Sequence, residues 1–164
     1  MVYTCAMSKP DCDVCNGLEI YGELPWIVES DIWRVELNPN QQHLGRTFVG
    51  LREHKSSLSE LSETELLEFH RILKKLEIGA RAAFGTSLFN WMCLMNNAVR
   101  DHQEPHVHWH MVPRYPVATE FYGRQYTDSA WPRQYNTGID PPYYPAVDEL
   151  EAIAVAFRHG ISVR

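Results

Sequence analysis

The sequence predicts an α+β fold: a mostly antiparallel, five-stranded sheet with one long helix packed across it and a second helix near the C-terminus. Three observations lead to this prediction. Five short segments have the apolar content or the period-two alternation of strands. An amphipathic segment of about six turns lies between the third and the fourth of them. A shorter amphipathic segment follows the last strand after a long loop. The 164 residues are enough for a single domain, with a core at about 12–115 and a loop-and-helix extension at 116–164.

The first three predicted strands lie at 26–28, 32–37 and 46–52. In the second of them, apolar residues alternate with Arg34 and Glu36, so one face of this strand is expected to be buried. A polar loop with turn residues joins the second strand to the third. These two strands are therefore expected to pair as an antiparallel hairpin.

The long helix is predicted to begin with a capping box. The Ser62 hydroxyl can accept a hydrogen bond from the third helical N–H, and Glu65 can reach back to the cap. Gly85 is expected to end the helix as its C-cap. The apolar face of the helix is formed by residues three and four apart, namely Leu66, Phe69, Leu73, Leu76, Ala80 and Ala83.

A fourth strand is predicted at 88–96, and after a short polar turn comes a strand that carries three histidines. His106, His108 and His110 alternate with single apolar residues. Because successive side chains of a strand point to opposite faces, the three imidazoles should form a row on one face. An ordinary half-buried strand would carry Thr, Lys or Glu at such positions, so we interpret the row as functional. The opposite face is apolar and consists of Val107, Trp109 and Met111.

Periodicity disappears between residues 116 and 144. A loop of this length without its own pattern is usually functional or disordered, and its many aromatic residues argue against disorder. The second helix is predicted at about 147–158, and Gly160 is expected to end it.

Composition narrows the class of protein. The net charge is −6 and the isoelectric point is about 5.7, which argues against nucleic-acid binding because that requires a basic surface. A small polyanionic substrate held by a few local donors is compatible with this charge. No apolar run approaches the ~20 residues of a membrane span, so no membrane association is expected. Residues 1–11 lack the pattern of a signal peptide, so the cytoplasm is the expected location.

Cys12 and Cys15 form a Cys-x-x-Cys pair near the N-terminus. In a reducing compartment such a pair indicates metal or redox chemistry rather than a disulfide. A thioredoxin-like motif should follow a strand and open a helix, and no strand pattern precedes Cys12. Two thiolates at this spacing can grip a zinc ion, which then needs two further ligands. Two cysteines without a joint function are the alternative.

The histidine row admits two kinds of chemistry. An imidazole can attack the phosphorus of a phosphate ester and form a phosphoramidate, which water or another acceptor then releases. Alternatively, two or three imidazoles can bind a catalytic zinc with an open position. The cysteine pair favours the first, because His54 and one histidine of the row would complete a closed Cys₂His₂ site. Such a zinc would be structural and would leave the other histidines free for covalent catalysis.

The run from His106 to Val112 resembles the His-φ-His-φ-His-φ-φ motif of the histidine triad (HIT) superfamily of nucleotide hydrolases and transferases. The resemblance extends over most of residues 12–115. It includes the Cys-x-x-Cys pair, the segment 58–65 at the start of the long helix, and Pro113-Arg114. The Pro-His-x-His-Trp-His form is similar to the bacterial branch described as diadenosine-tetraphosphate-hydrolase-like.

The resemblance implies a nucleotide hydrolase that cleaves the α-phosphate linkage of dinucleoside polyphosphates or AMP conjugates. His108 would be the nucleophile that forms a nucleotidyl-histidine, and His110 and Gln103 would contact the phosphate. A nucleotidyltransferase or phosphorylase of the same superfamily is the alternative. Such transferases tend to have Gln in place of the third histidine, so the presence of His110 favours hydrolysis. A non-catalytic nucleotide-binding module is a further alternative.

The resemblance also implies the remaining site residues and the partners. Asn38 falls at a ribose-binding position and Asn96 at a phosphate-contacting one. Arg46 stands where the family usually has a histidine, and it offers a second cation for phosphate. In zinc-bearing members, the metal ligands match Cys12, Cys15, His54 and His106. A purine nucleotide substrate, no organic cofactor, and a homodimer formed through the long helix and the adjacent strand are expected.

Overall fold

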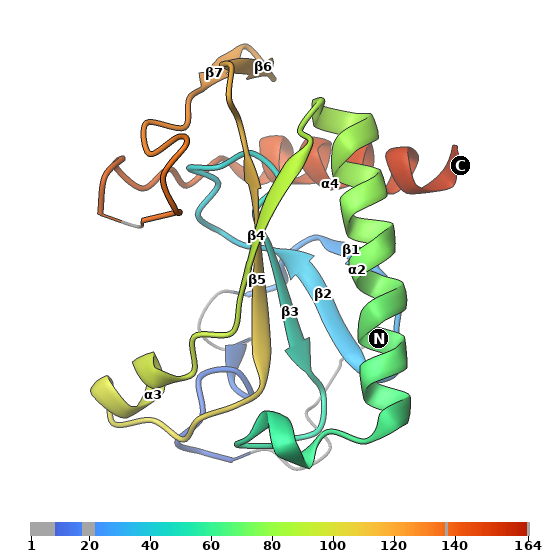
Figure 1. The fold of residues 1–164 in the computed structure, drawn as a ribbon, viewed down its shortest axis with the longest axis vertical. Coiled ribbons are helices and arrows are strands. Elements are labelled where there is room, and N and C mark those ends of the chain that lie inside the picture. Colours follow the sequence, from blue (N-terminus) through green and yellow to red (C-terminus); the bar gives the residue numbers. More distant parts are fainter. Residues whose placement is uncertain (1–8, 18–21, 137, 164) are drawn as a thin grey trace.

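The computed structural model describes residues 9–17, 22–136 and 138–163 (Figure 1). The segment 1–8, on which most of the signal-peptide prediction rests, lies outside them. Among the described residues, no helix has the length and apolar character that crossing a membrane requires. The elements, labelled as in Figure 1, are β1 (Trp26–Val28), β2 (Trp33–Leu37), β3 (Thr47–Leu51), the 3₁₀ helix η1 (Leu58–Glu60), α2 (Glu63–Phe84), β4 (Leu88–Met92), α3 (Asn96–Arg100), β5 (His108–Arg114), β6 (Thr119–Phe121), β7 (Arg124–Tyr126) and α4 (Val147–Ser162).

The predicted α+β architecture is confirmed. Five strands form one antiparallel sheet in the order β1-β2-β3-β5-β4. β5, which carries the last two histidines of the row, is therefore an inner strand between β3 and β4. In the register of β3 with β5, Gly50 lies opposite His108 and Phe48 lies opposite His110. Pro113 is inside β5, at a point where only β4 pairs with the strand, which is where a residue without an N–H is tolerated.

Helix α2 lies along one face of the sheet, and α4 crosses it (Figure 1). The capping box of α2 is confirmed: the Ser62 hydroxyl accepts from the Glu65 N–H at 3.3 Å, and the Glu65 carboxylate accepts from the Ser62 N–H at 2.6 Å. Gly85 ends the helix with a φ of 70°, in the left-handed region that favours glycine. The core between sheet and helices includes Trp33, Leu37, Val49, Ile72, Leu76, Val107, Met111, Ile153 and Phe157.

Three predicted boundaries were wrong. The fourth strand ends at Met92 rather than at 96, and Asn96 instead begins the short helix α3. A short apolar run does not by itself distinguish a strand from a helix, which explains this error. The histidine strand begins at His108, so His106 precedes it. Helix α4 continues past Gly160 to Ser162, because this glycine sits where α4 crosses α2; a Cβ on it would lie 2.6 Å from the carbonyl oxygen of Gly79.

The segment 116–144 contains a hairpin that the sequence did not predict. Strands β6 and β7 pair antiparallel as a separate two-stranded sheet. Tyr122 and Gly123 make the turn, and both have positive φ, at 53° and 74°. This is the pattern of a type I′ turn, in which glycine adopts the second position without strain. Strands of three residues are too short to show periodicity.

Candidate functional site

The face of the sheet that carries the histidine row opens into a cavity of about 450 Å³, a volume in the range of small-ligand sites. All three histidines line it, as the alternation predicted, while Val107 and Met111 point into the core. The cavity brings together most of the predicted site residues, namely Asn38, Arg46, Gln103, His106, His108 and His110. Asn96 is exposed and does not line the cavity, whereas its neighbour Asn97 lines it.

His108 is held by a hydrogen bond that fixes its tautomer. Its Nδ1 lies 2.8 Å from the backbone carbonyl oxygen of His106, and a carbonyl can only accept, so Nδ1 carries the proton. The lone pair of Nε2 is then available to a ligand in the cavity. Burial lowers the pKa of His108, so the imidazole stays neutral near pH 7, as a nucleophile must be. The Phe48 ring stacks on the imidazole, with the two centroids 5.3 Å apart.

His110 is the neighbour of His108 on this face. Their ring centroids lie 5.0 Å apart in an edge-on arrangement. Burial, with smaller contributions from the nearby His108 and Arg46, lowers the pKa of His110 to about 3. At neutral pH this ring is therefore uncharged and can donate one N–H hydrogen bond. Its buried Nδ1 has no partner among the described residues.

At the other end of the row, four potential ligand atoms from Cys12, Cys15, His54 and His106 lie within 4.8 Å of one another. The His106 Nδ1 is 3.3 Å from Cys12 Sγ and 3.4 Å from Cys15 Sγ, and the His54 Nδ1 is 3.5 Å from Cys15 Sγ. A tetrahedron with Zn–S of about 2.3 Å and Zn–N of about 2.0–2.1 Å has S···N edges of about 3.5 Å. The cluster therefore fits a tetrahedral zinc ion.

The tautomer of His106 supports this fit. Its Nε2 lies 2.8 Å from the carbonyl oxygen of Leu51 and must donate to it, so Nδ1 carries a lone pair that faces the two sulfurs. A second ring nitrogen bonded to a backbone carbonyl is the usual arrangement for a metal-binding histidine. Burial lowers the pKa of His106 to about 4, so the ring is neutral, as a ligand must be. Among the described residues, this is the one cluster of His, Cys, Asp or Glu that could hold a metal ion.

Sequence reasoning missed Phe48 as a site residue. It lies on β3 beside His108 and His110, and Gly50 leaves room for its ring, since a Cβ on Gly50 would lie 2.6 Å from Phe48 Cε1. The signal was available: in β3, Thr47, Val49 and Leu51 are the buried alternation, so an aromatic residue between them must lie on the opposite face.

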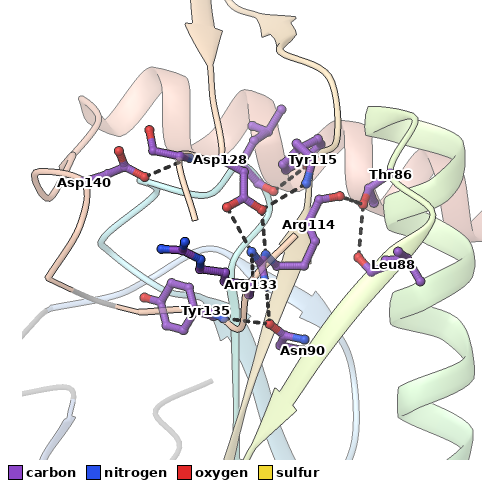
Figure 2. Close-up of polar contacts among 11 residues, drawn as sticks. Thr86, Leu88, Asn90, Arg114, Tyr115, Asp128, Arg133, Tyr135 and Asp140 are labelled. Atoms are coloured by element: carbon purple, nitrogen blue, oxygen red, sulfur yellow. Dashed lines mark hydrogen bonds and ion pairs between the residues drawn. The ribbon is translucent and has the colours of Figure 1, made fainter. Parts of the chain in front are cut away.

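The loop after β5 contributes a polar cluster at the edge of the site (Figure 2). Arg114, at the end of the histidine strand, binds the Asp128 carboxylate with two hydrogen bonds, from Nε at 2.6 Å and from Nη2 at 3.0 Å. It also donates to Asn90 Oδ1 at 2.6 Å and to the carbonyl oxygen of Arg133 at 2.9 Å. The same Asn90 oxygen accepts from the Tyr135 N–H at 3.2 Å. One guanidinium thus fixes the path of residues 128–135 against the sheet.

Comparisons with known proteins agree with this geometry. No family model matches the sequence. An uncharacterized HIT-like protein from Methanocaldococcus jannaschii is 29% identical over 106 residues, which cover 63% of this chain and 77% of that protein. A hypothetical histidine triad nucleotide-binding protein from Sulfolobus tokodaii superposes with a TM-score of 0.68 at 17% identity, covering 93% of each chain. The chain has the histidine triad (HIT) fold. The predicted resemblance to HIT proteins is thereby confirmed, and the assignment to the diadenosine-tetraphosphate-hydrolase-like branch stays a prediction.

One of the structures with the same fold contains zinc. A Zn-bound histidine triad family protein from Mycobacterium smegmatis superposes on this chain with a TM-score of 0.59 at 15% identity, covering 93% of this chain and 94% of that one. That zinc belongs to the relative. In the present HIT-like chain, the suggestion of zinc rests on the clustered ligand atoms of Cys12, Cys15, His54 and His106.

Proposed function

We propose that this protein is a nucleotide hydrolase of the diadenosine-tetraphosphate-hydrolase-like branch, which cleaves the α-phosphate linkage of a dinucleoside polyphosphate or an AMP conjugate. The observation that carries the proposal is the hydrogen bond from His108 Nδ1 to the His106 carbonyl inside a ligand-sized cavity. It leaves Nε2 as an unprotonated nucleophile and gives the ring a fixed orientation. The proposal takes residues 1–164 as one domain, with the core at about 12–115.

The reaction has two displacements at the same phosphorus. First, His108 Nε2 attacks the α-phosphorus, an Nε2–P bond forms, and the bond to the leaving group breaks with its electron pair. The ring becomes cationic in this intermediate, and the His106 carbonyl that accepts from Nδ1 stabilises the charge. Water then attacks the phosphorus, the Nε2–P bond breaks, and the nucleoside monophosphate and neutral His108 are released, with the proton of the water passing to solvent.

The other cavity residues bind and orient the substrate. His110, neutral and beside His108, donates to a phosphate oxygen. Gln103 lines the cavity with a buried Oε1 that has no partner among the described residues. Arg46 supplies positive charge for the phosphate, and Asn38 binds the ribose. Asn97 lines the cavity and Asn96 does not, so Asn97 takes the place of Asn96 as the phosphate contact in this proposal.

Cys12, Cys15, His54 and His106 would hold a structural zinc. Four protein ligands leave no open position on the metal, so its contribution is to tie the N-terminal segment to the histidine row rather than to activate water. A metal on the whole triad is not favoured, because His106 Nε2 bonds to the Leu51 carbonyl and its Nδ1 faces the sulfurs, so His106 has no nitrogen left to share with His108 and His110.

We further propose a homodimer through β4 and α2. Strand β4 is a terminal strand of the sheet, and its Leu88 is 51% exposed. A second β4 could pair with this edge and continue the sheet across the dimer. The mass of the protein in solution, measured by light scattering during gel filtration, tests this: a mass of about 19 kDa, that of one chain, would contradict it.

The decisive experiment compares the wild type with His108→Ala on a panel of dinucleoside polyphosphates and adenosine phosphoramidates. Turnover is expected in the wild type and should be abolished in His108→Ala. His70→Ala is the matched control, because His70 is an exposed residue of α2 and should leave activity unchanged. Undiminished activity of His108→Ala would refute the mechanism.

The products separate the alternatives. Nucleoside monophosphate formed equally with and without added phosphate indicates hydrolysis, whereas a nucleoside diphosphate formed only with phosphate indicates phosphorolysis. Tight binding of AMP without turnover of any substrate on the panel would indicate a non-catalytic nucleotide-binding module.

A further inference from the structure

Arg46 is a cavity residue whose positive charge is not neutralised by a described side chain. Its Nε is buried without a hydrogen-bond partner, and the guanidinium forms no ion pair with a described carboxylate. The other arginines near the site differ in this respect. Arg34, also on the cavity wall, pairs with Glu36 at 3.1 Å, and Arg114 is bound by Asp128. A largely buried guanidinium without a counter-charge is costly unless a ligand supplies the anion.

The backbone of Arg46 is fixed in place. Its carbonyl oxygen accepts from the Asn38 N–H at 2.9 Å and from Gln41 Nε2 at 2.8 Å. The side chain then has one aromatic support: its Cζ lies 5.6 Å from the centroid of the Tyr135 ring. This distance is within the range of a cation–π interaction. The imidazole of His43 packs edge-on against the same ring, with centroids 5.0 Å apart.

Tyr135 itself is held by the Arg114 cluster. Its N–H donates to the Asn90 oxygen that also accepts from Arg114, and Arg114 binds the carbonyl oxygen of Arg133 two residues earlier (Figure 2). Asp128, which anchors this segment, has a fully buried side chain. A continuous set of contacts therefore runs from the histidine strand, through Arg114 and Tyr135, to the guanidinium of Arg46.

We propose that Tyr135 is a positioning residue that holds the Arg46 guanidinium against the cavity so that it binds the phosphate group of the nucleotide beside His110. The inference rests on the proposed function for the identity of the ligand, a nucleoside 5′-phosphate. It gives the aromatic segment after β5 a role in the phosphate site, because Tyr135 of this segment supports the guanidinium of Arg46. The OH of Tyr135 has no partner among the described residues, so the ring, and not the hydroxyl, supplies the support.

Binding of AMP and of adenosine, measured by calorimetry on the full chain, tests the proposal without requiring turnover. The ratio of the two affinities isolates the contribution of the phosphate. Arg46→Gln should weaken AMP binding about tenfold to a hundredfold and leave adenosine binding unchanged. Tyr135→Leu should weaken AMP binding about twofold to thirtyfold, again with adenosine unchanged, and Tyr135→Phe should restore the wild-type ratio.

A double variant separates positioning from a general structural effect. If Tyr135 acts through Arg46, Tyr135→Leu should cause no further loss of AMP affinity in the Arg46→Gln background. An equal loss of AMP and adenosine affinity, or an additive loss in the double variant, would overturn the proposal. If Tyr135→Leu does not fold, Arg46→Lys answers the same question, because an ammonium keeps the charge and loses the planar stacking. It should lower the affinity ratio, and an unchanged ratio would overturn the proposal.

The two proposals fail separately. A wild type that binds AMP more tightly than adenosine but turns over no substrate refutes the hydrolase and leaves the positioning role intact. A wild type that hydrolyses substrate but binds AMP and adenosine equally refutes the positioning role alone.

Discussion

The Arg114 guanidinium and the Asp128 carboxylate form a two-bond ion pair that joins the end of the histidine strand to the loop after β7. Their side chains are 3% and 0% exposed. A buried ion pair adds little to the stability of a fold compared with apolar packing, but removal of one partner leaves an uncompensated buried charge. Since Arg114 also binds Asn90 and the Arg133 carbonyl, this charge would lie at the junction of three segments.

Asp128→Asn should therefore lower the free energy of unfolding by about 3–5 kcal/mol. Urea unfolding followed by circular dichroism measures the change. Glu151→Gln is a suitable control, because Glu151 pairs with Arg158 at the surface, where removal of the pair should cost less than about 1 kcal/mol. A loss below 1 kcal/mol for Asp128→Asn would show that the pair does not anchor the loop.

Acid should weaken the same anchor. Burial alone would raise the pKa of Asp128, but the hydrogen bonds and charge of Arg114, the nearby His43 and the hydrogen bond from the Tyr115 N–H together outweigh it, and the net pKa is lowered. A carboxyl whose pKa is lower in the folded state stabilises the fold above its unfolded pKa of about 3.9, and this stabilisation is lost as the pH falls through the folded value. The difference in unfolding free energy between wild type and Asp128→Asn should thus be constant from pH 5 to 7 and shrink below about pH 4. A difference that grows on acidification would contradict this sign.

The local pattern of the sequence was sufficient for the parts of this fold that depend on neighbouring residues. The capping box at Ser62, the C-cap at Gly85 and the row of histidines are local features, and each is found as predicted. The antiparallel hairpin of β2 and β3 follows in the same way from two alternating runs and a turn.

Contacts between distant segments had no such signal. The pairing of Arg114 with Asp128 and the support of Arg46 by Tyr135 join residues of a segment without periodicity to the sheet. Asn96 was misplaced for a related reason, because its apolar neighbours fit a strand or a helix equally well. Ligand chemistry predicted that one histidine of the row would join Cys12, but the choice of His106 came only from the family resemblance, since 93 residues of chain separate it from Cys12.

Zinc content provides a test of the cysteine–histidine cluster. The double variant Cys12→Ser/Cys15→Ser should lose the metal, measured as about one zinc per chain in the wild type, and should unfold at a lower temperature. Cys93→Ser is the control, because Cys93 lies outside the cluster and should retain the zinc. Zinc that survives in the double variant would indicate a metal on the histidine row instead.

Substitution of His110 distinguishes a hydrogen-bond donor from a general acid. Because burial lowers its pKa to about 3, His110 lacks the acidic proton of an imidazolium at neutral pH, and its single N–H acts as a neutral hydrogen-bond donor to the phosphate. His110→Gln keeps an N–H at this position and should retain most of kcat/KM on the substrate identified in the panel, with an unchanged pH profile above pH 5. His110→Ala removes the donor and should reduce kcat about 10²–10³-fold. If His110→Gln is as inactive as His110→Ala, and the acidic limb of the pH profile disappears in both, the histidine is an acid in the reaction and the neutral-donor assignment is wrong.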